Sequence, residues 1–345
     1  MKYFRRLFYI AYYLKQLNWQ KLQVFMDYVI HEQETSKIKL WTRILLDSLL
    51  YNISILEFFQ FGFYKKQIEK RNWAGTGYMY EYQLIMNPSN KRGILDDKTK
   101  FYKHYSQFFK HLVADIADLK KQDGLAEKIL GNPSGKIVFK IADGKCGDQV
   151  VIKPASQFNK ASMIHFMETE KYDLVEEFII QHSELNRLSP SAVNTVRIFT
   201  QLNTNNEVEI LGCRQRISIN SPVDNMAAGN IAAPIDEQTG VISGQGVYSD
   251  ITKSPESVHP ITGVKIEGFQ IPYWQEIISM IKKAALLYPQ NRSIGWDIVV
   301  TENGPGLIEG NHDWCKLVYQ LPVGKGLKPI LERHLSEFKL NNFTK

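Results

Sequence analysis

Three side chains near the C-terminus have the chemistry of a divalent-cation site. Asp297 lies in one apolar run, Glu309 and Asn311 lie in the next, and the turn-forming residues 303–306 separate the runs. Carboxylate and amide oxygens are the ligands that Mg²⁺ (or Mn²⁺) prefers, and such an ion indicates a nucleoside triphosphate and phosphoryl chemistry. An exposed hairpin with acidic residues in solvent is the alternative, but unpaired carboxylates beside so many apolar neighbours would be costly.

These three side chains can meet only on one face of the hairpin. Alternate residues of a strand share a face, so Glu309 and Asn311 point the same way. For Asp297 to join them, we expect a connection with an odd number of residues, about three or five. A two- or four-residue turn would place Asp297 on the opposite face.

A glycine-containing loop joins a second pair of predicted strands, at 136–141 and 149–153. Gly144 and Gly147 in this loop would let backbone N–H groups approach phosphate oxygens, and Lys140 and Lys153 beside it could add positive charge. The spacing matches neither a Walker loop nor a dinucleotide fingerprint. Many hairpins carry two glycines, so this pattern alone is weak.

The predicted strand at 173–180 carries further candidate ligands. Glu176, Glu177 and Ile179 precede a polar exit that contains Glu184. The backbone of such an edge could bind an adenine ring, and a carboxylate nearby could bind ribose hydroxyls. A buried strand with a polar exit is the alternative.

Three arginines lie on the next predicted strand pair, at 194–203 and 207–218. Arg197 is on the first strand, and Arg214 and Arg216 share a face of the second. Guanidinium groups bind phosphate or carboxylate through paired hydrogen bonds. A solvated ribbon with surface arginines is the alternative.

The elements around these residues predict an α+β fold, because antiparallel hairpins and helices occupy separate parts of the chain. Apolar residues at helical spacing, without prolines, predict helices up to about residue 70. Residues 221–265 are rich in Gly, Pro, Asn and Ser and predict loops. Further helices are expected at 96–119, at 274–287 and from about 328.

Composition limits the classes of function. The 345 residues suit two or three domains. The net charge of +6 comes without a long Lys/Arg run, which fits anionic small ligands or a membrane surface and argues against nucleic acid. Cys146, Cys213 and Cys315 are too scattered for a disulfide framework, so a cytoplasmic setting is expected.

The N-terminal helices allow two interpretations. Residues 1–43 carry eight Lys/Arg against three acidic residues, interleaved with Tyr, Phe and Trp. They could lie on the inner face of a membrane as peripheral helices, or they could cap the catalytic domain, which we favour. The apolar stretch 44–63 carries Asp47, Asn52, Glu57 and Gln60, which argues against a transmembrane span.

The ordered motifs resemble the ATP-grasp superfamily. The run Pro-Ser-Ala-Val-Asn-Thr-Val-Arg at 190–197, with Asp297 and Leu-Ile-Glu-Gly-Asn at 307–311, is similar to the sugar-transfer-associated ATP-grasp family. The resemblance covers roughly residues 90–335. It implies two α+β subdomains that clasp ATP, at 91–185 and 186–345, after a helical region at 1–90.

The resemblance also implies a role for each candidate residue. Nucleotide contacts would come from Lys98, Lys140, the loop of Gly144 and Gly147, Glu176, Glu177, Ile179 and Glu184, with Lys153 beside the loop. Arg197 would stabilise the γ-phosphate, with Arg214 or Arg216 near the acceptor. Asp297, Glu309 and Asn311 would hold Mg²⁺. The chain departs from the family pattern in its two-glycine loop and in Asn230, which stands where a glycine is often found.

The implied activity is that of an ATP-dependent carboxylate–amine ligase with an acyl-phosphate intermediate. The family's link to bacterial surface polysaccharides, such as capsule, implies a small-molecule or glycan carboxylate and an amine as substrates. A phosphotransferase that makes a stable phosphorylated sugar is one alternative. A non-catalytic ATP-binding assembly protein is another.

Overall fold

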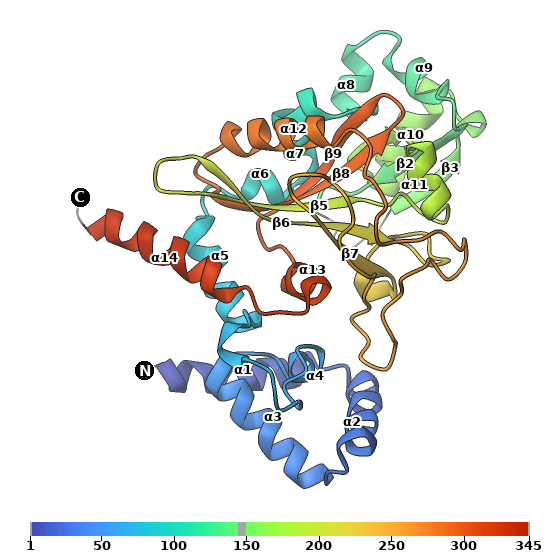
Figure 1. Ribbon diagram of the computed structural model, residues 1–345. Coiled ribbons are helices and arrows are strands. Elements are labelled where there is room, and N and C mark those ends of the chain that lie inside the picture. The colour runs from blue at the N-terminus through green and yellow to red at the C-terminus, as the bar shows by residue number, and fades with distance from the viewer. Residues whose placement is uncertain (1, 144–149, 344–345) are drawn as a thin grey trace.

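The computed structural model describes residues 2–143 and 150–343 and has two antiparallel sheets (Figure 1). The four-stranded sheet has the order β1 (Val113–Asp115), β4 (Leu174–Glu177), β2 (Lys136–Lys140), β3 (Val150–Pro154). The five-stranded sheet has the order β7 (Ile231–Ile235), β6 (Val208–Ile217), β5 (Val196–Leu202), β8 (Ser293–Thr301), β9 (Gly304–Asn311). With helices packed on both sheets and a helical N-terminal region, the predicted α+β class is confirmed.

The N-terminal region folds as helices, two of which begin at side-chain caps. Its helices are α1 (Lys2–Lys15), α2 (Trp19–Gln33), α3 (Lys37–Tyr51), α4 (Ile55–Gln60), the 3-10 turn η1 (Lys70–Asn72) and α5 (Thr76–Met86). Asn18 and Ser36 each accept a hydrogen bond from a backbone N–H three residues later, which starts α2 and α3. Phe25, Leu40 and Phe58 form the buried inner side. In the part of the chain that is described, no helix is long and apolar enough to cross a bilayer.

One face of the four-stranded sheet is covered by α8 (Ile116–Lys121), α9 (Leu125–Leu130) and α10 (Lys160–Glu170). Ile137, Phe139 and Val175 point to these helices and pack on Met163 and Met167. Because strand side chains alternate, Val138, Lys140 and Glu176 point to the other face. This sheet therefore presents a charged face away from its helices.

The single helix expected at 96–119 is wrong. The segment holds α6 (Gly93–Asp96), α7 (Lys98–Tyr105) and η2 (Ser106–Phe108), then β1 and α8. The backbone of β1 pairs with β4, which outweighs the local helical pattern. The side chain of Asp115 then accepts from the N–H of Asp118 and starts α8.

Two other boundaries also differ from expectation. The strand expected at 173–180 ends at Glu177, where the chain leaves the sheet. The loop expected at 221–265 contains β7, with Pro234 on an edge strand, where a missing N–H is tolerated. The helix expected at 274–287 is confirmed as α12 (Trp274–Leu287).

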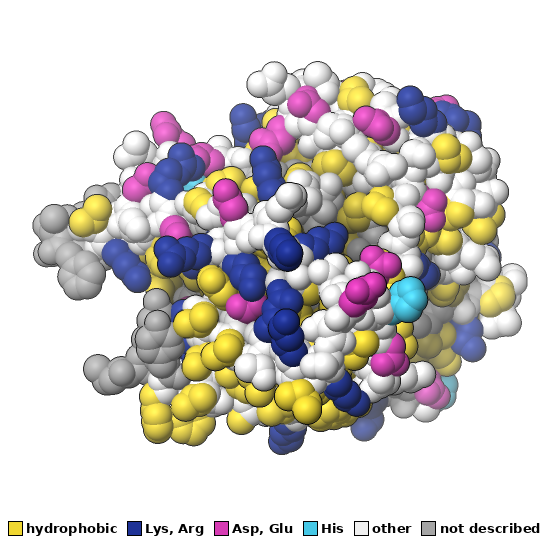
Figure 2. Space-filling model, turned by 60° about the horizontal axis from the view of Figure 1, so that its bottom comes forward, with side chains coloured by type: hydrophobic (Ala, Val, Ile, Leu, Met, Phe, Trp, Pro, Cys, Tyr) yellow, Lys and Arg dark blue, Asp and Glu magenta, His cyan; other side chains and the backbone are white. Residues whose placement is uncertain are grey.

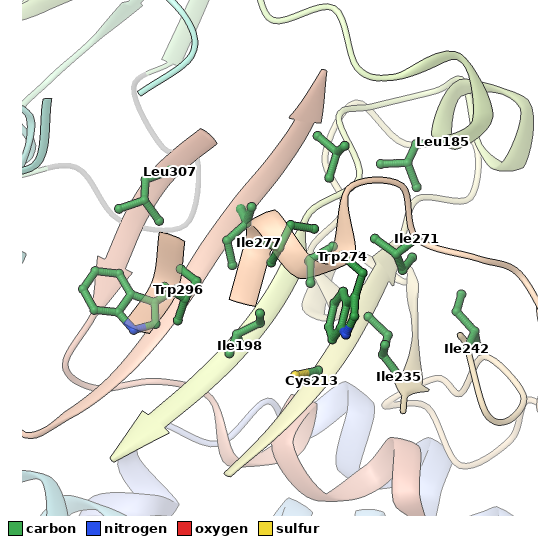
Figure 3. Close-up of a cluster of buried hydrophobic side chains, with 14 of the residues drawn as sticks. Leu185, Ile198, Cys213, Ile235, Ile242, Ile271, Trp274, Ile277, Trp296 and Leu307 are labelled. Atoms are coloured by element: carbon green, nitrogen blue, oxygen red, sulfur yellow. The ribbon is translucent and has the colours of Figure 1, made fainter. Parts of the chain in front are cut away.

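The five-stranded sheet lies between two helical layers (Figure 1). On one face, α7 and α12 cover apolar side chains of the strands, and Figure 3 shows Trp274 and Ile277 beside Ile198 and Cys213. Each such fully buried side chain contributes roughly 1.5–3 kcal/mol. The other face meets α5, α13 (Lys316–Gln320) and α14 (Lys328–Phe343), with Phe199 and Trp314 in contact.

The helical N-terminal region is attached to α13 by polar groups. Buried Glu57 accepts hydrogen bonds from the backbone N–H groups of Ser54 and Thr76 and lies 3.0 Å from the ammonium of Lys316. The side chain of Gln320 pairs with the N–H and C=O of Ala74, at 2.9 and 3.0 Å. Burial disfavours a charged Glu57, but Lys316 and these hydrogen bonds keep its pKa below the ordinary value. The attachment therefore depends on a buried charge that is fully paired.

We expect Glu57→Gln to lower the free energy of unfolding by about 3 kcal/mol, because it leaves the Lys316 ammonium without its partner. Urea denaturation followed by circular dichroism measures this change. Glu168→Gln removes an acidic partner from the exposed Lys120 pair and is the matched control, with no measurable change expected. Equal stability of the two variants would contradict the proposed attachment.

Candidate active site

The β8–β9 hairpin reaches the predicted geometry by a different route. Its turn holds two residues, 302 and 303, so the prediction of an odd-length turn is wrong. Ile298 pairs with Leu307, the register then shifts, and Asp297 pairs with Glu309. Ile308 is the extra residue of a β-bulge. Leu307 and Glu309 therefore lie on opposite faces although they are two residues apart, one in the core and one beside Asp297.

The two-residue turn is held in place by its neighbours. The N–H of His182 donates to the carbonyl of Val300 at 2.7 Å, and the N–H of Ser183 donates to the Glu302 carboxylate, also at 2.7 Å. The hydroxyl of Tyr273 donates to the Glu302 carbonyl at 2.8 Å. The segment that follows β4 is thus tied to the tip of the hairpin, which connects the two sheets.

Glu309 and Asn311 share a face, as predicted, and Gly310 between them has a packing reason. The rings of Trp296 and Phe101 lie where a side chain would go, because a Cβ on residue 310 would be only 3.0 and 3.1 Å from them. The Nδ2 group of Asn311 donates to Glu309 Oε1 at 3.0 Å. A glycine between the two polar residues therefore lets β9 lie against α7 without displacing either ring.

Strand register places four charged residues in one row across the five-stranded sheet. Arg214 pairs with Arg197, Arg197 with Asp297, and Asp297 with Glu309. Arg197 donates to both oxygens of the buried Asp297 carboxylate, through Nε and through Nη2 at 2.7 Å. Arg216 adds a third bond to Asp297 at 3.0 Å. The Asp297 carboxylate is thus fixed by two guanidinium groups.

These guanidinium groups decide the ionisation of Asp297. Burial alone would favour the neutral acid, but the charges of Arg197 and Arg216 outweigh burial and hold its pKa below the ordinary value. Arg216 also lies 2.6 Å from Asp224. The backbone N–H and the hydroxyl of Thr195 in turn donate to Asp224 at 2.8 and 2.6 Å. A continuous polar chain therefore runs from Thr195 to Asp297.

The pKa of Glu309 is shifted in the opposite direction from that of Asp297. Burial first, and then the adjacent carboxylate of Asp297, raise its pKa. Two neighbouring carboxylates with an amide beside them form an oxygen donor set in which a divalent cation would relieve the repulsion. The residues present therefore fit Mg²⁺. Among residues 2–143 and 150–343 there is no group of three or more His, Cys, Asp or Glu side chains suited to a metal, so this mixed set is the candidate site.

The four-stranded sheet contributes a second charged group. The ammonium of Lys140 lies 2.6 Å from buried Glu176, and His111 Nε2 lies 3.4 Å from the same carboxylate. Burial disfavours ionised Glu176, but Lys140 and His111 lower its pKa to about 2. Lys140 is therefore held in an extended position on the face that carries no helices.

Lys98 is affected by the charges of both groups. Its backbone N–H donates to the carbonyl of Ala142 at 2.9 Å, and its ammonium donates to the carbonyl of Ile141 at 3.2 Å. Burial and the nearby Lys140 lower the pKa of Lys98, while Glu309 and Glu176 act in the opposite direction. Lys98 therefore responds to charged residues of both sheets.

Several other predicted site residues make contacts of their own. Lys153 pairs with Ile137, so it is on the opposite face from Lys140. The carboxylate of Glu177 accepts from the N–H of Leu112 at 2.9 Å, and Glu184 forms an exposed pair with Arg187 at 2.6 Å. Arg214 donates to the Tyr319 carbonyl at 2.6 Å and holds the end of α13 instead of joining Asp297. Ile179 is half-buried beyond β4, and Gly144 and Gly147 lie outside the described residues.

Some residues that complete the site were not predicted from the sequence. Asp224 and His111 bind Arg216 and Glu176, respectively, and no local pattern identifies either. Thr195 has a signal, since it lies two residues before Arg197 and so shares its face. Ile152 is half-exposed and, by its pairing with Val138, lies on the same uncovered face as Lys140. Val138 and Ile152 give that face an apolar patch beside its charges.

We expect Glu176→Gln to reduce the free energy of unfolding by about 3 kcal/mol at pH 7, because a pKa near 2 stabilises the fold wherever Glu176 is ionised. This stabilisation is complete above the pKa of the unfolded chain, about 4.3, and is lost as the pH falls toward 2. The variant and the wild type should therefore converge in urea titrations between pH 7 and pH 3. Glu127→Gln on exposed α9 is the control, and a difference independent of pH would contradict the account.

Comparison with known proteins gives one family and several distant folds. No curated protein matches this sequence. The solved structures that it resembles include the ATP-grasp ligase PsnB complexed with minimal precursor (11% identity, TM-score 0.42), with 73% of this chain and 63% of that chain covered. The D-alanine–D-alanine ligase from Bacillus anthracis has 14% identity and a TM-score of 0.39, with 80% and 79% covered. D-cycloserine synthetase DcsG has 10% identity and a TM-score of 0.40, with 72% and 73% covered.

These likenesses are too distant to indicate a substrate, and the chain spans less than two thirds of the length of PsnB. The sequence family gives a firmer result. The family described as "sugar-transfer associated ATP-grasp" matches residues 78–335, which is well over half of the chain. The chain therefore belongs to the sugar-transfer associated ATP-grasp family and has the ATP-grasp fold, whose enzymes use ATP and are typically ADP-forming ligases.

Proposed function

We propose that the protein is an ATP-dependent carboxylate–amine ligase that works through an acyl phosphate. The observation that carries this proposal is Lys98, which is bonded to the carbonyls of Ala142 and Ile141 just after β2 while the charge of Glu309 on the other sheet acts on its pKa. A polyphosphate needs cations on both of its sides and a metal-binding carboxylate nearby. Lys98, Lys140 and the face of Asp297, Glu309 and Asn311 offer this combination.

The acidic and basic residues of the site would have different roles in binding the nucleotide. Glu309 and Asn311, with Asp297 behind them, would hold Mg²⁺, which when bound neutralises phosphate charge. Lys98 and Lys140 would bind phosphate oxygens, and Val138 and Ile152 would pack against the flat base. Arg197 lies beside the metal-binding face and would stabilise charge on the transferred phosphoryl group.

The reaction needs no nucleophilic side chain. A carboxylate oxygen of the substrate attacks the γ-phosphorus of ATP, the bond to the bridging oxygen breaks, and ADP leaves. An amine nitrogen then attacks the acyl carbon, the bond to phosphate breaks, and phosphate and a proton are released. The chain's part is to align the reactants and to exclude water from the acyl phosphate.

The family description supports a proposal for the substrate class. A family associated with sugar transfer suggests a glycan or small sugar acid as the carboxylate, with an amino acid as the amine, in the synthesis of a surface polysaccharide. A phosphotransferase or a non-catalytic ATP-binding assembly protein would use the same phosphate-binding residues. Only the fate of the phosphoryl group and the release of ADP separate the three.

We expect Glu309→Gln to abolish ADP release, because the metal-binding set loses a carboxylate. In a thermal melt with ADP, added MgCl2 should raise the Tm of the wild type and leave that of the variant unchanged. In EDTA at pH 8 the variant should be at least as stable as the wild type, because an amide does not repel Asp297. Glu267→Gln, at an exposed position, is the control. Full turnover by Glu309→Gln would overturn the metal assignment.

The ligase and the phosphotransferase differ in oxygen transfer. Uronic acids labelled with ¹⁸O in the carboxylate, screened with amino acids and ATP, should deliver one labelled oxygen to inorganic phosphate. Mass spectrometry of the released phosphate measures this transfer. A stable phosphorylated sugar with unlabelled phosphate would favour the phosphotransferase, and failure to bind Mg-ATP in calorimetry would favour the assembly protein.

A further inference from the structure

The N-terminal helices turn apolar side chains outward. On α1, the exposed residues Phe4, Leu7, Phe8 and Tyr12 recur at helical spacing and form one stripe. On the other side of α1, Tyr13 is buried and Arg6 donates to the carbonyls of Leu49 and Leu50. The helix thus packs inward through aromatic and polar contacts and shows its apolar stripe to solvent.

Helix α3 repeats this arrangement. Its inner side buries Leu40, Ile44 and Asp47, and Asp47 pairs with Lys70 at 2.6 Å. Its outer side exposes four large aliphatic side chains, Ile38, Leu45, Leu46 and Leu50. Ile38 is the most exposed of them, at 82%. An outward face made mainly of leucine and isoleucine is unusual for a helix of a globular protein.

The two stripes belong to one surface. Helices α1 and α3 pack together, and Arg6 of α1 bonds to the last turn of α3, so the start of one stripe adjoins the end of the other. Together these side chains form the N-terminal apolar surface, which consists of Phe4, Leu7, Phe8, Tyr12, Ile38, Leu45, Leu46 and Leu50. Figure 2 shows hydrophobic side chains gathered along the lower edge of this side of the molecule, with Lys and Arg among them.

The exposed charged side chains of α1 and α3 themselves are positive. Lys15, Lys37 and Lys39 are exposed, and Arg5 is exposed with a bond to Glu81. Neither α1 nor α3 carries an exposed carboxylate, since α1 has no acidic residue and Asp47 of α3 is buried. An apolar stripe bordered by cations complements anionic headgroups above a hydrocarbon layer.

A hollow at the edge of this surface adds a second observation. It has a volume of about 440 Å³ and is lined by Arg6, Leu50, Tyr51, Arg71, Asn72, Trp73, Lys328 and Glu332. Three cations face one carboxylate, and Glu332 is itself paired with Lys328 at 3.1 Å. Because Arg6 and Leu50 also belong to the α1–α3 contact, the basic hollow and the apolar stripes adjoin.

We propose that the N-terminal apolar surface docks on a bilayer that contains anionic lipid, with the basic hollow receiving a phosphate headgroup. Phe, Tyr, Leu and Ile side chains would enter the interface, and Lys15, Lys37 and Lys39 would lie at headgroup level. Helices of this kind lie in the plane of the interface and do not cross the hydrocarbon core. The proposal concerns attachment alone and is independent of the reaction catalysed.

The test uses the full chain and vesicles of phosphatidylcholine, alone or with added phosphatidylglycerol. The wild type should co-sediment with the anionic vesicles. The double variant F8E/I38E should bind them at least about tenfold more weakly. Ile261→Glu is the matched control, because Ile261 is 64% exposed outside this surface, and its binding should be unchanged. Both variants should keep the wild-type Tm, which shows that they fold.

A second arm tests the charge. Lys37→Ala and Lys39→Ala should each weaken binding to the anionic vesicles roughly fivefold, and Arg71→Ala should do so through the hollow. None should alter binding to pure phosphatidylcholine. Failure of the wild type to bind anionic vesicles would overturn the proposal. So would light scattering that shows a dimer dispersed by F8E/I38E without vesicle binding, since the surface would then join two copies of the chain.

Discussion

Asp297 is buried between two guanidinium groups, and the arrangement of the candidate site follows from this contact. Arg197 and Arg216 come from adjacent strands, so the carboxylate that they share fixes β5, β6 and β8 relative to one another. Each charge would be costly alone in the interior, but together with Asp224 they form an alternating series that leaves none unpaired. The next carboxylate along the row, Glu309, has no such dedicated guanidinium. It is left facing Asp297, with a raised pKa and a geometry suited to a divalent cation.

In the four-stranded sheet, a lysine pairs with a buried carboxylate. Glu176 is buried and ionised because Lys140 and His111 lie beside it, and in return it keeps Lys140 directed away from the helices of that sheet. Lys98 connects the two systems, since its backbone is bonded to the end of β2 and its ammonium responds to Glu309. Positive and negative groups of both sheets therefore act on one lysine. Such a field suits a triphosphate and its metal, and the family membership agrees with this interpretation.

Sequence patterns were sufficient for some of these features and not for others. The Asn-Thr-x-Arg and Glu-Gly-Asn motifs identified Arg197, Glu309 and Asn311, because alternation on strands is a local property. The length of the hairpin turn could not be predicted, because the bulge at Ile308 appears only in the pairing of β8 with β9 and has no local sequence pattern. Lys153 was assigned because it flanks the glycine loop and Arg214 because it shares a strand face with Arg216, yet register and a carbonyl of α13 decide where they point. Asp224 and His111 could not be predicted either, because no local pattern links them to their partners Arg216 and Glu176. The boundaries near residues 90 and 185 remain predictions.

Helix α13 has a consequence for how much of the chain makes a stable unit. Its first residue, Lys316, is neutralised by Glu57, and Gln320 at its end completes the backbone hydrogen bonds of Ala74. Both partners precede residue 78, where the match to the family begins. A chain shortened to the matched region would lose the carboxylate that neutralises Lys316 and the backbone groups of Ala74 that Gln320 binds. The segment that matches the family is therefore shorter than the segment that supplies all the partners of Lys316 and Gln320.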